Sequence, residues 1–289
     1  MRNKPFVCLI LAAALGQSAA AAEDTIVIST GREGGGYHGI GTRLKDILAE
    51  QGVAAEVVAS AGSTQNLNAL NDPESPVSVG LTQADALGFF LKANPDFAGK
   101  YLILSEIGKE CVFIVSAEGS AIADDGDLQD KGGQKISVQD PNSGVAVTWN
   151  YMTQLEPRLK NTQAVFTDTM ETLLAIKAEG RNSKTTAMLV QRPTARSPAM
   201  QVVLENPKAF RFIAVTDWDL NDKLPDGRAV YSFDEVTVQE KSWGFDKSVD
   251  TICTQGLMLA ARDKLTADQR SRLANVMLLA AERVLQDKP

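Results

Sequence analysis

The sequence has few of the residues that most enzyme active sites use. Its 289 residues include one histidine, His38, and three cysteines. It has no Gly-x-Ser-x-Gly motif and no group of His, Cys and acidic residues at the spacing of metal ligands. We therefore expect a protein that is not an enzyme and that has no cofactor and no metal site. Asp217 and Asp219 are accordingly interpreted as solvated loop charges rather than as calcium ligands.

Basic clusters and long apolar runs are also missing. Lys and Arg number 29 against 36 Asp and Glu, which gives a formal net charge of −7. No stripe of Lys and Arg with interleaved aromatic residues is present, so nucleic acid is not an expected partner. After residue 22 the sequence has no apolar run of about 18 residues, the minimum for a membrane-spanning helix, so we expect none.

The first 22 residues are typical of an export signal. A basic start at Arg2 and Lys4 precedes an apolar run from Phe6 to Leu15, and three alanines end at Ala22. We expect a signal peptide over residues 1–22, cleaved near Ala22, and export through the Sec pathway to the periplasm. The mature chain then has 27 basic and 36 acidic residues and is expected to be a monomer.

Two cysteines remain after cleavage of the signal. Cys111 and Cys253 lie at the edges of apolar, strand-like segments. In an oxidising compartment they are candidates for a disulfide, and buried free thiols are the alternative.

A glycine-rich loop follows the first expected strand and opens an amphipathic helix. It contains Gly34, Gly35 and Gly36. The first backbone N–H groups of a helix have no partner within the helix and lie at the positive end of its dipole, so such a turn can hold an anionic group. The alternative without a ligand is a tight turn that needs glycine for its positive φ.

The same loop also fits a dinucleotide-binding fingerprint. Gly34, Gly36 and Gly39 have the required spacing, and Glu56 follows at the distance of a ribose-binding acid. This predicts a Rossmann oxidoreductase as a second hypothesis. Two features weigh against it, because the export signal leads to a compartment with little free nicotinamide cofactor and because Glu56 lies inside its strand rather than at the end.

Strand-to-helix junctions recur along the chain. Polar residues follow expected strands at 60–66, 82–85 and 139–144, and Ser63 or Thr64 is expected to cap its helix. Alternation of strands and helices predicts parallel pairing, which brings such junctions to one edge of a sheet. The second half repeats the plan of the first, which suggests a cleft between two lobes.

The boundaries of these lobes follow from composition and from a late return strand. Residues 117–133 are rich in Asp, Gly and Ser, and residues 251–261 are interpreted as a strand that leads back to the first half. We predict lobe 1 over 23–116 plus 253–289 and lobe 2 over 117–252. Residues 101–105 and 111–116 are predicted to be two separate, antiparallel strands.

Several of these motifs resemble one known family. Gly31-x-x-Gly34-Gly35-x-Tyr37, Gly62-Ser63-x-x-Asn66 and Gly80-x-x-Gln83-x-Asp85 are similar to the N-terminal half of the TAXI-type solute receptors of TRAP transporters. The resemblance covers about residues 26–147 and 250–284. It implies an α/β, two-lobed periplasmic-binding-protein type II fold with mostly parallel sheets and crossover hinge strands. It also implies capture of a small organic anion, a dicarboxylate or a glutamate-like acid, for delivery to a TRAP-type membrane permease.

The resemblance implies a ligand site at the strand-to-helix junctions. Its residues are Tyr37, Ser63, Thr64, Gln83, Asn142, Ser143 and Gly144. We hypothesise that backbone N–H groups and hydroxyls at the two helix starts hold the anion while Tyr37 covers its carbon skeleton. Arg192 follows a strand of the second half and is a candidate for a bidentate carboxylate contact, with a solvated loop arginine as the alternative.

Other interpretations stay open. The partner could be an ABC permease or a sensor rather than a TRAP permease. Residues 195–231 match the family poorly, which also allows a periplasmic interaction module with a vestigial cleft. The sequence does not identify the ligand.

Overall fold

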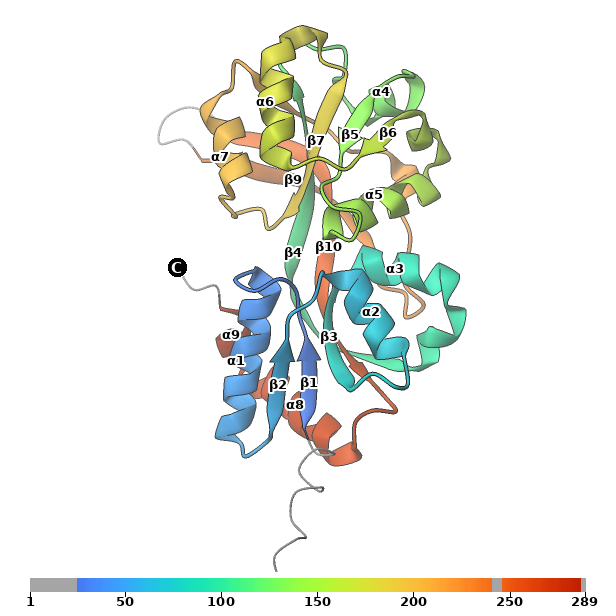
Figure 1. Ribbon diagram of the computed structural model, residues 1–289, viewed down its shortest axis with the longest axis vertical. Coiled ribbons are helices and arrows are strands. Elements are labelled where there is room, and N and C mark those ends of the chain that lie inside the picture. The colour runs from blue at the N-terminus through green and yellow to red at the C-terminus, as the bar shows by residue number, and fades with distance from the viewer. Residues whose placement is uncertain (1–24, 241–245, 287–289) are drawn as a thin grey trace, which may run out of the picture.

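The computed structural model describes residues 25–240 and 246–286. The signal peptide predicted for residues 1–22 lies outside the described residues. Two α/β lobes are stacked along the long axis of the molecule and are connected by two long strands, β4 (Tyr101–Ala117) and β10 (Lys247–Ala261) (Figure 1). The predicted two-lobed α/β fold is confirmed. None of the helices in the described segments combines the length and the apolarity needed to cross a bilayer.

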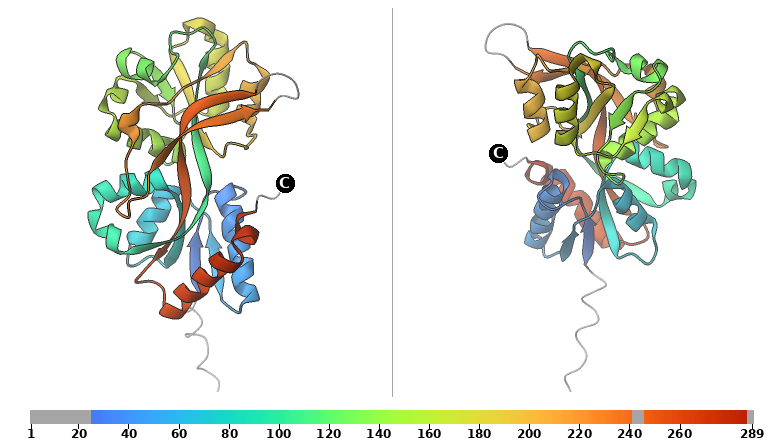
Figure 2. Two further views of the ribbon diagram at one scale, coloured as in Figure 1. Left: turned by 180° about the vertical axis from the view of Figure 1, so that it is seen from behind. Right: turned by 45° about the horizontal axis from the view of Figure 1, so that its top comes forward.

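The first lobe is built from three strand-to-helix units and the C-terminal helices. Its strands are β1 (Ile26–Ser29), β2 (Ala55–Val58) and β3 (Val77–Gln83), and its helices are α1 (Gly36–Glu50), α2 (Ser63–Asn71), α3 (Ala84–Ala93), η1 (Pro95–Gly99), α8 (Ala267–Leu279) and α9 (Ala281–Leu285). β1 is parallel to both β2 and β3, as predicted. α8 and α9 pack against α1, so the last helices of the described residues lie on the same lobe as β1 (Figure 2). α8 starts with the capping box of Thr266 and Gln269.

The second lobe repeats this plan with more irregular segments. Its strands are β5 (Lys135–Ser137), β6 (Gln163–Val165), β7 (Thr185–Gln191), β8 (Phe210–Ile213) and β9 (Tyr231–Gln239). Its helices are α4 (Asp125–Asp130), α5 (Gly144–Leu155), η2 (Pro157–Asn161), α6 (Thr169–Glu179), η3 (Gly180–Asn182), α7 (Pro198–Glu205) and η4 (Trp218–Leu220). β5 is parallel to β6 and β7. The helix-flanked strands of both lobes are therefore parallel, as their alternation with helices predicts.

All strands join one mixed sheet that passes through both lobes. Its order is β2-β1-β3-β10-β4-β7-β5-β6, with β8 beside β4 and β9 beside β10. β10 is antiparallel to β3, β4 and β9, and β4 is antiparallel to β7 and β8. The prediction of mostly parallel sheets therefore holds for β1, β2 and β3 and for β5, β6 and β7, but not for the whole sheet, because the long connecting strands run against their neighbours, β8 and β9 included.

The prediction of two separate strands at 101–105 and 111–116 is wrong. β4 is one continuous strand, and residues 106–110 stay extended instead of turning. Gly108 has φ 129° and pairs with Gly256, where the register of β4 and β10 shifts. A bulge of this kind bends a strand without ending it, which explains why β4 continues from one lobe into the other.

The two connecting strands are also covalently linked. Cys111 and Cys253 pair directly across β4 and β10 and form a disulfide that joins positions 142 residues apart in the sequence. Both cysteines are buried. The left view of Figure 2 shows β4 and β10 side by side where they pass between the lobes.

On one side the lobes share a core. α3 of the first lobe packs against α5 of the second, and Leu87, Tyr151 and Tyr231 belong to one buried cluster. Asp85, fully buried, accepts hydrogen bonds from Thr148 Oγ1 at 2.6 Å and from the Tyr231 hydroxyl at 3.2 Å. These bonds hold the lobes together at the α3–α5 side.

Candidate functional site

A pocket of about 430 Å³ lies where the strand-to-helix junctions of the two lobes meet. We call it the interlobe pocket. Its volume is within the range of about 300–1,000 Å³ that is usual for small-molecule sites. Among the residues proposed from the sequence, those that line it are Gly35, Gly36, Tyr37, Ser63, Gln83, Ser143, Gly144 and Arg192. Gly34, Thr64 and Asn142 lie next to lining residues but not in the wall itself.

Two helices from different lobes begin at this pocket. α2 starts after Gly62, whose φ of 135° favours glycine, and α5 starts after Ser143. A Cβ atom on Gly62 would lie 3.7 Å from the Asn142 carbonyl oxygen, so the two helix starts approach each other closely. The first amides of each helix have no partner within the helix, and the positive ends of both helix dipoles lie at the pocket.

The serine hydroxyls at these helix starts bond to protein groups. The prediction that Ser63 or Thr64 caps α2 is wrong, because the cap is Gly62 and has no side chain to bond with. Ser63 Oγ instead accepts from the Gln83 backbone N at 3.2 Å and lies 3.5 Å from Gln83 Oε1. Ser143 Oγ caps α5 by accepting from the Ala146 N at 3.1 Å, and it donates to the Val138 carbonyl. The backbone amides are therefore the donors best placed for a ligand.

Gly144 brings the second lobe into contact with Gln83. A Cβ atom at Gly144 would lie 2.5 Å from Gln83 Oε1. Real Cβ atoms do not come this close to an oxygen, so a side chain at position 144 would require either the Gln83 carboxamide or α5 to shift. Glycine at this position allows the start of α5 to lie directly against the Gln83 side chain.

Glu110 forms a polar part of the pocket wall that the sequence interpretation missed. It lies on β4, and its Oε2 accepts a hydrogen bond from Gln83 Nε2 at 2.9 Å. The Tyr37 hydroxyl donates to the Thr82 carbonyl at 3.4 Å and also lies close enough to the Glu110 carboxylate to lower its pKa. Burial, with a smaller effect from the Asp85 charge, raises the pKa of Glu110 to about 7, although Gln83, Tyr37 and Arg192 oppose the rise. Glu110 follows several polar residues of β4, among them Glu106 and Lys109, so no local sequence signal distinguishes it from them.

Positive charge enters the pocket from both lobes. Arg192, after β7, donates from Nη2 to the Ile107 carbonyl at 3.2 Å and packs over Gly108, where a Cβ atom would lie 3.4 Å from its guanidinium. Arg32, from the glycine loop of the first lobe, is exposed at the rim. These guanidinium groups and Glu110 are the charged groups of the pocket wall as the structure describes it.

The loop before α5 has an unusual backbone. Gln139 is the one non-glycine residue in the described segments with a positive φ, 63°. Its side chain donates to Thr169 Oγ1 at 3.0 Å, and it lines the interlobe pocket. Such a conformation costs about 1 kcal/mol or more, and strained residues of this kind concentrate at binding sites.

Two residues weighed in the sequence lie outside the pocket wall. Glu56, the candidate ribose-binding acid, is the second residue of β2 and is exposed. Because Glu56 lies inside its strand, it does not match the dinucleotide fingerprint, in which the acid follows the strand. His38 is partly buried, and its Nδ1 lies 3.3 Å from Thr30 Oγ1.

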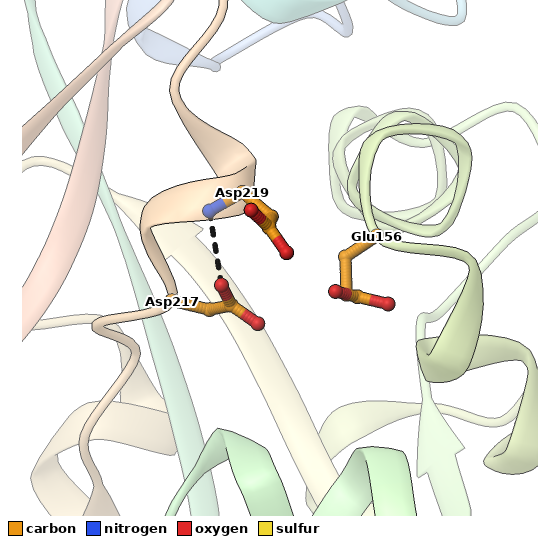
Figure 3. A group of neighbouring side chains, drawn as sticks. All are labelled: Glu156, Asp217 and Asp219. Carbon is orange, nitrogen blue, oxygen red and sulfur yellow. Dashed lines mark hydrogen bonds between the residues drawn. The ribbon is translucent and has the colours of Figure 1, made fainter.

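Three acidic side chains elsewhere in the second lobe form ion pairs with one arginine. Carboxylate oxygens of Glu156, Asp217 and Asp219 lie within 4.8 Å of one another, with Glu156 facing the other two (Figure 3). Arg158 Nη2 lies 2.8 Å from Glu156, 3.5 Å from Asp217 and 3.8 Å from Asp219. Its hydrogen bond to Glu156 lowers the pKa of that carboxyl to about 2. Asp217 is thus not the solvated charge that the sequence predicts, because it forms part of an ion-pair network.

Comparison with known proteins places the fold and the family. No curated protein sequence matches the chain. The chain is similar in fold to XAC2383 from Xanthomonas citri bound to ATP, with a TM-score of 0.53 and 13% identity over 91% of this chain and 88% of that one. The periplasmic aliphatic sulphonate binding protein SsuA from Escherichia coli aligns over 90% of this chain and 72% of its own, with a TM-score of 0.46 and 17% identity. Residues 28–284 match the NMT1-like family, and the chain therefore belongs to the NMT1-like family.

Proposed function

We propose that this chain is a periplasmic solute-binding receptor that captures a small organic anion, a dicarboxylate or a glutamate-like acid, in the interlobe pocket. One observation carries the proposal: α2 from one lobe and α5 from the other begin at the same pocket. An anion between them accepts hydrogen bonds from both sets of free amides and is stabilised by both dipoles. Each such charge-assisted bond contributes about 1.5–3 kcal/mol.

The connecting strands supply a means of opening and closing. Gly108 and Gly256 face each other at the register shift of β4 and β10, next to the pocket. Rotation at this point separates the helix starts and exposes the pocket, whereas closure brings Gly144 against Gln83. A ligand that contacts both lobes favours the closed state, because only that state offers both sets of donors.

Export, partner and lobe limits belong to the same proposal. The signal peptide at 1–22 leads the chain to the periplasm, where it acts as a monomer. Lobe 1 comprises 23–116 plus 253–289 and lobe 2 comprises 117–252. Delivery to a TRAP-type permease rests on the resemblance of residues 26–147 and 250–284 to TAXI-type receptors.

A thermal-shift screen tests the proposal. The purified chain is screened against dicarboxylates, amino acids, inorganic oxyanions and NAD. A true ligand at about one hundred times its Kd adds about 2.7 kcal/mol to the free energy of unfolding, which is a clear rise in Tm. We expect a rise with at least one organic acid. A rise with NAD and with no acid contradicts the proposal and favours a dinucleotide-binding protein.

A further inference from the structure

Glu110 is an unexpected residue in a pocket built for an anion. Its carboxylate lies in the pocket wall, together with two helix starts that both favour negative charge. A second negative group beside it is repelled, and the repulsion is strong because the site is partly shielded from water. A ligand that carries only negative charge therefore has to avoid Glu110.

Gln83 fixes the carboxylate close to the helix starts. Its Oε1 lies beside Ser63 at the start of α2 and faces Gly144 at the start of α5, and its Nε2 donates to Glu110 Oε2. One carboxamide group thus separates the anion-binding amides from the Glu110 carboxylate. A ligand of a few atoms can contact both at once.

When Glu110 is ionised, its remaining hydrogen-bonding capacity is that of an acceptor. A carboxylate accepts about four hydrogen bonds; Gln83 supplies one at 2.9 Å, while the neighbouring Tyr37 hydroxyl donates to the Thr82 carbonyl. Arg192 is the cation whose charge lowers the pKa of this carboxyl, and its Nη2 donates to the Ile107 carbonyl. A ligand donor with positive charge, an ammonium group, fits this surplus of acceptor sites.

We infer that, within the proposed function, Glu110 is a specificity-determining residue that selects a zwitterionic ligand, one with an ammonium group next to the anionic group held by the helix starts. The anionic group lies between α2 and α5, and the ammonium group donates to Glu110. Amino acids belong to this class of ligand, whereas simple dicarboxylates do not.

Matched ligand pairs that differ by an amino group test this inference. The pairs are L-glutamate with glutarate, L-aspartate with succinate, and L-alanine with propionate, each titrated by calorimetry. The variants are Glu110→Gln and, as a control, Glu106→Gln, which removes the same charge from an exposed position on β4 outside the pocket. Circular dichroism and Tm establish that each variant is folded.

In at least one pair, the wild-type chain is expected to bind the ammonium-bearing member tenfold or more tightly than its partner, since a charge-assisted bond is worth about that factor. Glu110→Gln is expected to remove most of this preference, and Glu106→Gln to keep it. Acids that bind without any preference for the amino group, or a preference that survives in Glu110→Gln, overturn the inference and leave the proposed function intact. Failure of every member of every pair to bind overturns the inference, whereas the proposed function is contradicted only when no organic acid in the thermal-shift screen raises Tm.

A pH series on the wild-type chain gives a second measurement that needs no variant. The groups that influence the ionisation of Glu110 are Asp85 from α3, Gln83 from β3, Tyr37 from α1 and Arg192 after β7. An ammonium ligand prefers ionised Glu110, so its affinity is expected to rise between pH 6 and pH 8. The affinity for the matched acid is expected to fall over the same interval, and parallel curves for the two contradict the inference.

Discussion

At the scale of single residues, the pocket combines groups that favour a negatively charged ligand group with one that disfavours it. The helix starts favour negative charge, whereas Glu110 disfavours it, and Gln83 contacts both through the two ends of one amide group. Tyr37 lies beside Glu110 with a hydroxyl whose pKa is raised by burial and by the Glu110 charge, so that the phenol stays neutral and keeps the proton that it donates to the Thr82 carbonyl. With the role proposed for Glu110, the specificity of the site depends on the protonation state of this one carboxyl group.

This property of Glu110 predicts a pH-dependent stability effect in the ligand-free chain. Its pKa of about 7 lies above the value of about 4.3 for an unfolded glutamate, so the folded state retains the proton more strongly between these values. Folding stability is therefore lost as pH rises through this interval. The Glu110→Gln variant lacks this loss. From pH 4.5 to pH 8, the difference in free energy of unfolding between variant and wild type is therefore expected to change by up to about 3 kcal/mol in favour of the variant.

Urea unfolding of both proteins at the two pH values measures this difference. Contributions from other titrating groups, such as Asp85, cancel between wild type and variant when the substitution leaves them unchanged. A difference that is the same at pH 4.5 and pH 8 contradicts the raised pKa.

At the scale of the elements, the sequence predicted the regular parts of the fold well. The alternation of strands and helices indicated β1, β2 and β3 as parallel strands, and the polar residues after them indicated the pocket edge. Continuity of β4 could not be predicted, because Gly108 and the acids around it resemble a turn until Gly256 of β10 is placed opposite them. Glu110 was missed for the same reason, since its place in the pocket depends on a pairing of residues distant in sequence.

The helix start of α5 predicts the effect of adding one methyl group. Gly144→Ala places a Cβ atom against Gln83 Oε1, whose amide is held by Ser63 and Glu110. We expect the affinity for the acid found in the screen to fall about tenfold or more, because overpacking of this kind costs about 1–3 kcal/mol. Calorimetry measures the change. Gly132→Ala is the control, since a Cβ there meets no atom within 4 Å, and equal affinities of the two variants contradict the close approach of the lobes.

At the scale of the whole molecule, the two connecting strands organise the fold. β4 and β10 carry the hinge glycines, the disulfide and Glu110, and they connect lobes whose other contacts are concentrated at α3 and α5. The contacts between α3 and α5 hold the lobes together on one side, and β4 and β10 bend between the lobes. This arrangement favours opening of the interlobe pocket on the side of Arg32 and the glycine loop.

The disulfide predicts a large dependence of stability on redox conditions. It closes a loop of 142 residues, so its removal is expected to lower the free energy of unfolding by about 2–4 kcal/mol. Unfolding by urea with and without a reductant measures the effect. The double variant Cys111→Ala and Cys253→Ala serves as control and is expected to be insensitive to the reductant. A wild-type chain with the same stability under both conditions contradicts the role of the bond.

The central claim is that one anion contacts the helix starts of both lobes. The most direct test is a titration of the isotope-labelled chain with the acid that raises Tm most in the screen, followed by amide NMR. We expect the amides of Ser63 and Thr64 in α2 and of Gly144 and Val145 in α5 to shift together with a single Kd. Shifts confined to the amides of one lobe, at saturating ligand, contradict the claim.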